Sequence, residues 1–487
     1  MSTTTTHPAG QPVPPAPGAD DGARTVSLYQ AQKTIYPRAV TGFFANWRWA
    51  VVWLTQLVFY GLPWLYWNDR QAVLFELASR RFYLFGLVLY PQDFIYLTAL
   101  LLISAYALFL FTAVGGRLWC GYACPQTVYT EIFLWVERKI EGDRAARMKR
   151  DAGAWTADKL GRKAAKHGAW VAIALWTGFT FAGYFTPIRQ LAAETVVLNL
   201  GPWQTFWVLF YGFATYGNAG FMREQVCKYM CPYARFQSAM FDKDTLIISY
   251  DSSRGEPRGS RSKKADPAKL GLGSCVDCNL CVQVCPTGID IRNGLQYECI
   301  GCAACVDVCN GVMDKMGYAR GLVRYDTQNG MAQGLSRAQL VRRVLRPRVL
   351  VYTAVLALIV AGVGTSLMMR LPFKADVVRD RAALARLVDD GQVENVYRLQ
   401  IMNATESVQD YTVQVAGLPG IALPAPVRVQ VGPAEARWIT LSPRVPAQTA
   451  LTLKPGAHEV EFTIERVARG GDDARSLREK STFVLPR

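Results

Sequence analysis

Eight of the twelve cysteines lie in one short segment, and their spacing constrains the fold more than any other feature. They form two runs of the pattern C-x2-C-x2-C-x3-C, the first followed by Pro286 and the second by Asn310. Paired runs of this kind are typical of ferredoxins with two [4Fe–4S] clusters, in which the fourth cysteine of each run ligates the other cluster. Zinc sites use C-x2-C pairs separated by a longer loop. The spacing therefore predicts a first ligand set of Cys275, Cys278, Cys281 and Cys309, and a second ligand set of Cys299, Cys302, Cys305 and Cys285.

The second run lacks the proline that normally follows the last ligand, because Asn310 stands there. We expect this difference to weaken the turn after Cys309 and to leave the ligand set intact.

Five apolar runs reach the length of about 20 residues that a helix needs to cross a bilayer. They cover residues 49–68, 94–116, 168–188, 195–222 and 349–369. Tryptophan and tyrosine crowd their ends, as is typical of membrane interfaces. The runs predict a membrane protein with a five-span α-helical bundle. The shorter stretch 82–92 is expected to lie at the interface or to re-enter the membrane.

Lysine and arginine are distributed unevenly between the predicted loops. They are frequent in 117–167 and just before the fifth run, whereas 189–194 holds only Arg189. The positive-inside rule therefore places 117–167 and the cysteine-rich region in the cytoplasm and residues 370–487 outside. Free thiolates also favour a reducing compartment, so two independent arguments agree. The net charge of +16 fits this membrane pattern, and no nucleic-acid-binding motif is present.

The chain after the fifth run is predicted to form strands. Apolar residues alternate with polar ones in four segments, and this period of two with intervening Gly and Pro predicts an antiparallel β-sandwich. The alternating residues are Tyr397, Leu399 and Ile401; Tyr411, Val413 and Val415; Val427, Val429 and Val431; and Val460, Phe462 and Ile464.

The predicted organisation is therefore a series of five parts. They are a cytoplasmic N-terminal segment 1–46, disordered over 1–25; a transmembrane bundle 47–223 with its cytoplasmic loop 117–167; a cytoplasmic region 224–347 with an inserted ferredoxin-like domain near 266–325; a fifth transmembrane helix 349–369; and an all-β periplasmic domain 375–487.

The remaining four cysteines form two matching C-x3-C-P pairs, Cys120 with Cys124 and Cys227 with Cys231, each just after a predicted span. Residues four apart on a helix share one face, so each pair is predicted to present two sulfurs together. Soft thiolates of this kind suit Cu(I), another Fe–S cluster or zinc. A dithiol that cycles to a disulfide, or buried structural cysteine, would also use this pattern. Spacing does not decide among these uses.

The whole pattern resembles the cbb3-type cytochrome c oxidase accessory proteins, the family called CcoG, RdxA or FixG. The segments that carry the resemblance are Ile35-Tyr-Pro-Arg-Ala39, the run from Gly115 to Glu131 around Cys120, and the C-terminal β domain. The resemblance implies that the β domain is immunoglobulin-like. It also implies a role in oxidase maturation at the bacterial inner membrane, by reduction of Cu(II) to Cu(I) for the oxidase copper centre.

This interpretation predicts two [4Fe–4S] clusters as cofactors, and copper as a further metal. The ferredoxin cysteines are used by clusters, so the metal substrate is expected at the four remaining cysteines. We expect these four to be catalytic: Cys120, Cys124, Cys227 and Cys231. The expected partners are oxidase subunits, or copper chaperones and transporters, and a homodimer is left open. The sequence does not name the cytoplasmic electron donor. An electron-transfer subunit of a quinone-linked respiratory chain and a redox-sensing assembly scaffold are the alternative functions.

Overall fold

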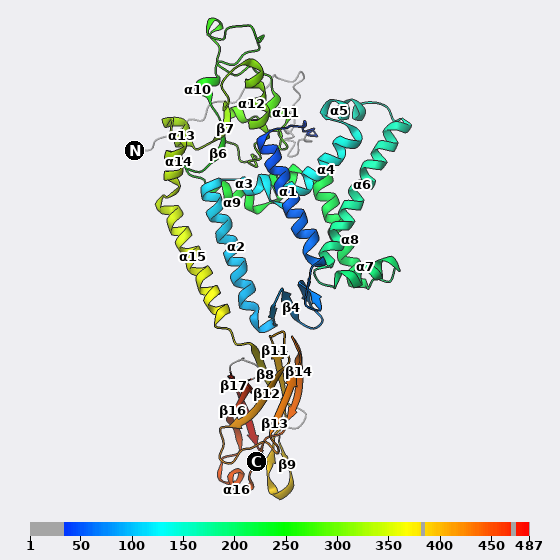
Figure 1. Ribbon diagram of the computed structural model, residues 1–487, viewed down its shortest axis with the longest axis vertical. Coiled ribbons are helices and arrows are strands. Elements are labelled where there is room, and N and C mark those ends of the chain that lie inside the picture. Colours follow the sequence, from blue (N-terminus) through cyan, green and yellow to red (C-terminus); the bar gives the residue numbers. More distant parts are fainter. Residues whose placement is uncertain (1–33, 381–384, 469–473, 487) are drawn as a thin grey trace, which may run out of the picture. The chain divides into compact units, whose positions relative to one another are not determined.

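The computed structural model describes residues 34–380, 385–468 and 474–486 (Figure 1). The disorder expected for 1–25 concerns residues outside these ranges. The chain divides into a unit of residues 1–35 and a unit of residues 36–487, and all elements below belong to the second unit.

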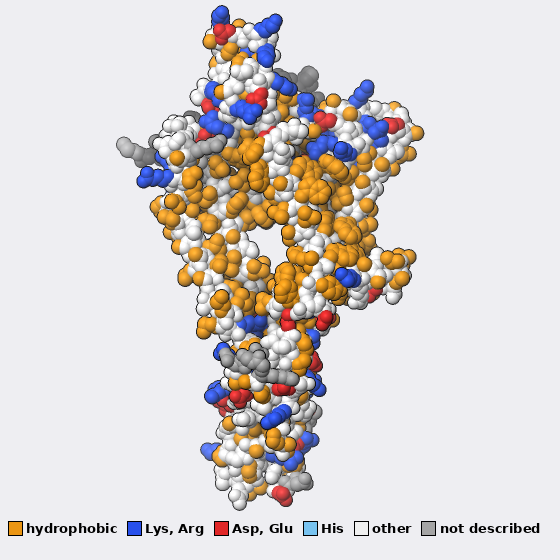
Figure 2. All heavy atoms as spheres, in the orientation of Figure 1, with side chains coloured by type: hydrophobic (Ala, Val, Ile, Leu, Met, Phe, Trp, Pro, Cys, Tyr) orange, Lys and Arg blue, Asp and Glu red, His pale blue; other side chains and the backbone are white. Residues whose placement is uncertain are grey.

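Two helices within the described ranges are long and apolar enough to cross a membrane. They lie in Pro91–Gly115, which contains α2 (Phe94–Gly115), and in α15 (Pro347–Met368). Their apolar side chains are largely exposed, among them Phe94, Ile95 and Leu358. Exposed apolar faces of this size need lipid or protein to cover them. In Figure 2, hydrophobic side chains gather over the helical part of the molecule, and Lys and Arg lie mainly beyond it.

The other three predicted spans differ from the helices that form there. The first helix, α1, covers Phe43–Gly61 and so begins before 49 and ends before 68. Most of run 168–188 lies in α6 (Ala157–Ala182), which begins before 168 and ends before 188. Run 195–222 is not one helix: α7 (Ile188–Val196) ends, and α8 (Pro202–Gly217) starts at a proline, which is favoured in the first turn of a new helix. The five-span bundle therefore stays a prediction.

Helices α6 and α8 pack closely because small residues face each other. A Cβ atom on Gly178 would lie 2.1 Å from the Val208 carbonyl oxygen, and one on Gly212 would lie 3.2 Å from the Leu175 side chain. Backbones can approach this closely only where side chains are small, as is common between membrane helices.

The stretch 82–92 forms strands. In it, β4 (Arg81–Leu84) pairs antiparallel with β3 (Val73–Glu76) and β5 (Leu87–Leu89). A two-stranded ribbon of β1 (Tyr66–Trp67) and β2 (Arg70–Gln71) precedes them.

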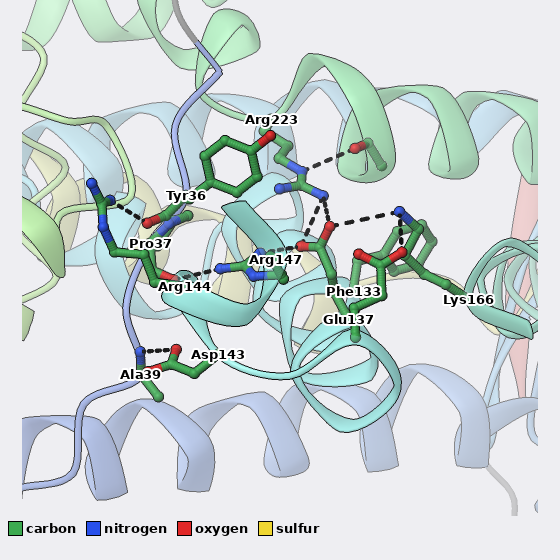
Figure 3. Close-up of polar contacts among 12 residues, drawn as sticks. Tyr36, Pro37, Ala39, Phe133, Glu137, Asp143, Arg144, Arg147, Lys166 and Arg223 are labelled. Atoms are coloured by element: carbon green, nitrogen blue, oxygen red, sulfur yellow. Dashed lines mark hydrogen bonds and ion pairs between the residues drawn. The ribbon is translucent and has the colours of Figure 1, made fainter. Parts of the chain in front are cut away.

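Helices α3 (Leu118–Tyr122), α4 (Pro125–Glu141) and α5 (Arg144–Ala152) follow α2. Near the end of α4, the buried Glu137 carboxylate pairs with Arg147 at 2.5 Å and with Arg223 at 3.2 Å (Figure 3). The segment around Tyr36 lies against α5, where Arg144 donates a hydrogen bond to the Tyr36 carbonyl and Arg147 one to the Pro37 carbonyl, both at 2.6 Å. The Ile35–Ala39 motif thus has a structural role.

The cysteine-rich region is organised around a two-stranded sheet of β6 (Ile247–Tyr250) and β7 (Val323–Asp326). Helix α12 (Ala304–Met316) joins this region to α1, because the Asp307 carboxylate accepts hydrogen bonds from the Phe44 and Ala45 amides at 3.2 and 2.8 Å. The remaining helices are α9 (Pro232–Met240), α10 (Ser252–Gly255), α11 (Leu280–Gln283), α13 (Gln328–Gln333) and α14 (Arg337–Val344).

The C-terminal part is an antiparallel β domain, as predicted. One sheet has the order β14-β11-β8 and another β13-β12-β16-β17, and their inner faces share one apolar core. Tyr397, Leu399 and Ile401 of β11 are fully buried, which confirms the predicted alternation. The strands are β8 (Phe373–Arg379), β11 (Tyr397–Asn403), β12 (Gln409–Ala416), β13 (Val427–Val431), β14 (Ala436–Leu441), β16 (Gly456–Arg466) and β17 (Arg475–Leu485). A smaller sheet of β9 (Arg386–Leu387), β10 (Val393–Glu394) and β15 (Arg444–Val445) and helix α16 (Ala447–Thr452) complete the domain.

Candidate functional site

The four cysteines of the first ligand set line one small cavity, although Cys309 comes from the other run. The cavity is lined by Cys275, Cys278, Cys281 and Cys309, with apolar side chains around them. Burial, together with the neighbouring Cys281, Cys275 and Cys278 thiols, raises the pKa of the Cys309 thiol to about 12. Four sulfurs around one cavity fit the ligand set of a [4Fe–4S] cluster.

A positive charge lies beside this first set. Arg292 also lines the cavity and is held by ion pairs to Asp277 and Asp290, both at 2.6 Å. Burial raises the pKa of Cys281 to about 11, while the Arg292 guanidinium opposes that rise because it favours the thiolate. Arg292 thus offsets part of the cost of forming the thiolate that cluster ligation requires.

The second ligand set is more deeply buried. Burial raises the pKa of Cys305 well above its ordinary value, and the thiols of Cys302, Cys299 and Cys285 raise it further. Cys285, from the first run, therefore lies within electrostatic reach of the three cysteines with which it is predicted to act. The side chains present in both sets fit the two clusters, and the individual ligand assignment stays a prediction.

Both runs turn sharply at the same position, the residue directly after the second cysteine. Asn279 and Ala303 precede α11 and α12 in the left-handed backbone region, with φ of 54° and 58°. A left-handed alanine costs about 1–2 kcal/mol. The repeated turn lets the third cysteine of each run face back toward the other two.

The missing proline after Cys309 has a structural reason. Helix α12 continues from Ala304 through Cys309 to Met316, so no turn forms after the last ligand and a proline would interrupt the helix. The Asn310 side-chain oxygen accepts a hydrogen bond from the Gly321 amide at 2.9 Å. The expectation of a weakened turn was wrong, because the chain does not turn there.

The C-x3-C-P pairs do not lie on single helices, as the sequence analysis supposed. Cys120 is in α3, whereas Cys124 is extended and precedes α4; Cys227 is in a π-helical turn (Val226–Met230), and Cys231 is extended before α9. Each proline occupies the first turn of the following helix, where its missing N–H costs nothing. Each pair therefore spans a break between two helices.

The fold brings the two pairs together into what we call the four-thiol site: Cys120, Cys124, Cys227 and Cys231. Burial, together with the nearby Cys124, Cys120 and Cys231 thiols, raises the pKa of Cys227 to about 12. The Cys120 thiol donates a hydrogen bond to the buried Gln237 side-chain oxygen at 3.3 Å. Residues 107 positions apart in the sequence, Cys120 and Cys227, thus share one site.

No three His, Cys, Asp or Glu side chains in the described part of the chain are arranged as a single-metal site. This finding suits the two ligand sets, because the sulfurs of a cubane surround a cluster and not one ion. At the four-thiol site, no three of the four sulfurs converge on one point in this structure. Two thiolates from either pair would suffice for a Cu(I) ion, which favours soft sulfur ligands.

The four-thiol site lies directly against the second ligand set. Cys120 and Cys227 pack in one apolar group with Cys302 and Cys305. The contact is close because residue 121 is a glycine: a Cβ there would lie 2.8 Å from the Gly301 carbonyl and 2.9 Å from the Cys302 Cα.

Sequence reasoning missed the side chains that hold the two pairs together. The Gln126 amide donates hydrogen bonds to the carbonyl oxygens of Asn218 at 2.9 Å and Arg223 at 3.0 Å, just before Cys227. Gln126 stands next to Pro125 in the run that carries the family resemblance. This position was the only sign in the sequence that Gln126 helps to build the site.

Comparisons with known proteins find similarity over three regions of the chain. Family models match as a "4Fe-4S dicluster domain" over residues 222–328, a "4Fe-4S binding domain" over 97–142, and the "IG-like fold at C-terminal of FixG" over 363–486. The chain is 41% identical to the nitrogen fixation protein FixG of Rhizobium meliloti over 427 residues, covering 81% of this chain and 82% of that protein. It is 39% identical to protein RdxA of Cereibacter sphaeroides over 408 residues, covering 81% and 84%.

A solved structure of a FixG-related protein from Vibrio parahaemolyticus matches 24% of this chain and 97% of its own, with 24% identity and a TM-score of 0.20. The family models and the relatives with about two-fifths identity identify an iron–sulfur protein. The chain belongs to the FixG/RdxA family.

Proposed function

We propose that this chain is a membrane-bound electron-transfer protein that assists assembly of cbb3-type cytochrome c oxidase by reducing Cu(II) to Cu(I) for the oxidase copper centre. In this proposal Cu(II) is the substrate and the four-thiol site binds it. Thiolates favour Cu(I) over Cu(II), so this site assists the reduction and retains the product.

The observation that supports the proposal best is the contact between the four-thiol site and the second ligand set. Cys120 and Cys227 pack in the same apolar group as Cys302 and Cys305, and Gly121 lies directly against the Gly301–Cys302 backbone. Two bound [4Fe–4S] clusters would supply one-electron transfer, which matches the single electron that Cu(II) accepts. Arg117 strengthens the contact, since its guanidinium donates hydrogen bonds to the Cys299 carbonyl at 3.3 Å and, from its other nitrogen, to the Ala234 carbonyl.

The proposal includes a location and partners. The exposed apolar faces of α2 and α15 favour a membrane protein, and the charge distribution favours the inner membrane with the ferredoxin region in the cytoplasm and the β domain in the periplasm. The β domain would then meet oxidase subunits, copper chaperones or copper transporters on the periplasmic side. Fusions of a reporter at Gly330 and Pro455 should give opposite signals, and equal signals would contradict this topology.

The copper role is tested by the double variant Cys227→Ser with Cys231→Ser in the purified full-length protein. We expect loss of Cu(I) binding and of Cu(II) reduction, with the visible absorption of the clusters retained. Met230→Leu, an exposed neighbour between the two cysteines, is the control and should behave as the wild type. Normal copper binding by the double variant, or loss of its clusters, would show that the four thiols do not have this role.

The route of the electron is tested separately by Gly121→Val. The added side chain cannot fit between α3 and the Gly301–Cys302 backbone, so the two sites must separate. We expect clusters and copper binding to remain while Cu(II) reduction slows. Gly161→Val on α6 is the matched control, because a Cβ at Gly161 meets nothing within 4 Å. Equal reduction rates in the two variants would mean that this contact is not the route.

A further inference from the structure

A cavity of about 380 Å³ lies among α1, α4, α6 and α8, next to the four-thiol site. Its walls are mainly apolar and aromatic, with Phe59 from α1, Phe181 from α6 and Tyr211 from α8. Small-molecule sites in proteins are typically clefts of about 300–1,000 Å³ with apolar walls and a few polar groups. The cavity therefore has the size and lining of a binding site for a small, largely apolar molecule.

One polar atom in this cavity lacks a partner, although the side chain that carries it, Gln56, hydrogen-bonds Tyr129. The side-chain oxygen of Gln56 is buried and has no hydrogen-bond partner among the residues that the structure describes. Leaving a buried acceptor unpaired costs about 1–3 kcal/mol. The neighbouring hydroxyls already interact with each other, since Tyr60 lies 3.0 Å from Thr177 and 3.4 Å from Tyr129. A ligand that fits this cavity should thus bring a hydrogen-bond donor to Gln56.

The cavity lies beside the four-thiol site, and this position favours a ligand that can exchange electrons. Ala123 and Pro125, the residues on either side of Cys124, both line it. The helices that form it also expose apolar side chains outward, such as Leu57 on α1 and Phe210 on α8. A ligand would therefore enter from an apolar phase and rest beside the four-thiol site.

We propose that this cavity binds the ring of a lipid-soluble quinol, which donates a hydroxyl hydrogen bond to Gln56 and supplies electrons to the four-thiol site as a second source besides the clusters. A planar ring fits the aromatic walls, and a quinol is an apolar donor of both hydrogen bonds and electrons. One quinol and two Cu(II) ions give one quinone, two Cu(I) ions and two protons, which leave to water. The electron-supplying role rests on the proposed function, whereas binding of the ring does not.

Binding is tested on the full-length protein in lipid nanodiscs with a photoreactive benzoquinol, and the labelled peptides are mapped. We expect labelling of peptides from α1 and α8 that excess unlabelled duroquinol prevents. Gln56→Leu should weaken competition by duroquinol about tenfold through loss of one buried hydrogen bond. Gln190→Leu is the control, because Gln190 is exposed on α7 and away from the cavity lining.

A second variant fills the cavity. Ala214→Phe places a ring in the space that the quinol would occupy, and should abolish labelling while iron content stays normal. Labelling that persists in Ala214→Phe, or that falls on the outward faces of α2 and α15, would show partition into lipid and overturn the proposal. If Ala214→Phe loses iron through misfolding, an unchanged duroquinol affinity in Gln56→Leu overturns the proposal just as well.

Failure of this inference can be told apart from failure of the proposed function. With quinol and Cu(II) supplied anaerobically, two Cu(I) ions should form for each quinol consumed. If quinol labels the cavity but Cys227→Ser with Cys231→Ser still forms Cu(I), the copper site is wrong and the quinol site stands. If quinol binds and no Cu(I) forms while another reductant produces it, the electron-supplying role of the cavity is wrong.

Discussion

The Asp307 carboxylate joins the ferredoxin region to the first long helix, and its removal gives a measurable prediction. Asp307 lies on α12 and accepts hydrogen bonds from the Phe44 and Ala45 amides, in the first turn of α1. Gly42 permits this approach, because a Cβ there would lie 2.4 Å from the Asp307 carboxyl carbon. The carboxylate thus satisfies two free N–H groups of the helix and interacts favourably with its dipole.

Asp307→Ala should lower the stability of this junction by about 0.5–4 kcal/mol. A lost N-terminal cap costs about 0.5–2 kcal/mol, and a partly buried charge at a helix end contributes up to about 2 kcal/mol more. Since about 1.4 kcal/mol is a factor of ten, the open form of the first turn should become at least about twofold and up to about 700-fold more populated.

Hydrogen–deuterium exchange of the peptide that contains Phe44 and Ala45 measures this opening directly. Asp314→Ala is the matched control, since Asp314 lies on the same helix and pairs with Arg320 in an exposed position. We expect fast exchange of the first turn of α1 in Asp307→Ala and wild-type exchange in Asp314→Ala. Equal exchange in the two variants would refute the view that Asp307 anchors α1.

Three further predictions concern other contacts. Glu137→Gln removes the carboxylate that pairs with the buried Arg147 and its neighbouring cations. The free energy of unfolding should fall by about 3–5 kcal/mol, and the apparent unfolding temperature by about 10 °C. Gly178→Leu should separate α6 from α8 and lower thermal stability, whereas Gly161→Leu, with no neighbour within 4 Å, should have little effect. Cys285→Ser should perturb the electron paramagnetic resonance signal of the cluster at the second ligand set, and a change confined to the first set would contradict crossed ligation. The wild-type protein should hold about eight iron atoms per chain.

Local patterns in the sequence predicted the local structure well. The alternation around Leu399 and Phe462 predicted strands because a period of two can bury one face of a sheet, and both residues are fully buried. The cysteine runs predicted two ligand sets, because a ferredoxin spacing leaves few ways to surround a cluster, and the individual assignment stays a prediction. The break between α7 and α8 was missed, since the apolar run continues across Gly201 and hides the proline that starts a new helix.

The four-thiol site could be predicted only in part. The motif spacing identified the cysteines, but it suggested one helix for each pair, whereas the proline starts a second helix in both pairs. Contacts between distant segments, such as that of Gly121 with Gly301, leave no periodic signal. A glycine in a short helix often has only a local role. The role of Gly121 is therefore visible only in the structure, where the second ligand set lies beside it.

The two halves of the four-thiol site are held at two points along α4. Near the start of this helix, just after Cys124, the Gln126 amide holds the carbonyls of Asn218 and Arg223. Near its end, the Glu137 carboxylate holds the Arg223 side chain, with contacts of 3.2 Å and 3.3 Å (Figure 3). Arg223 has a positive φ of 39°, which a non-glycine residue rarely adopts.

Arg223 is therefore fixed through both its backbone and its side chain, four residues before Cys227. One contact alone would leave the second cysteine pair free to rotate about that point, whereas two contacts fix its direction relative to α4. This arrangement explains how two motifs about a hundred residues apart can form one site without a bond between them. It also means that variants of Gln126 and Glu137 should loosen the same segment, so their effects on the four-thiol site should not add.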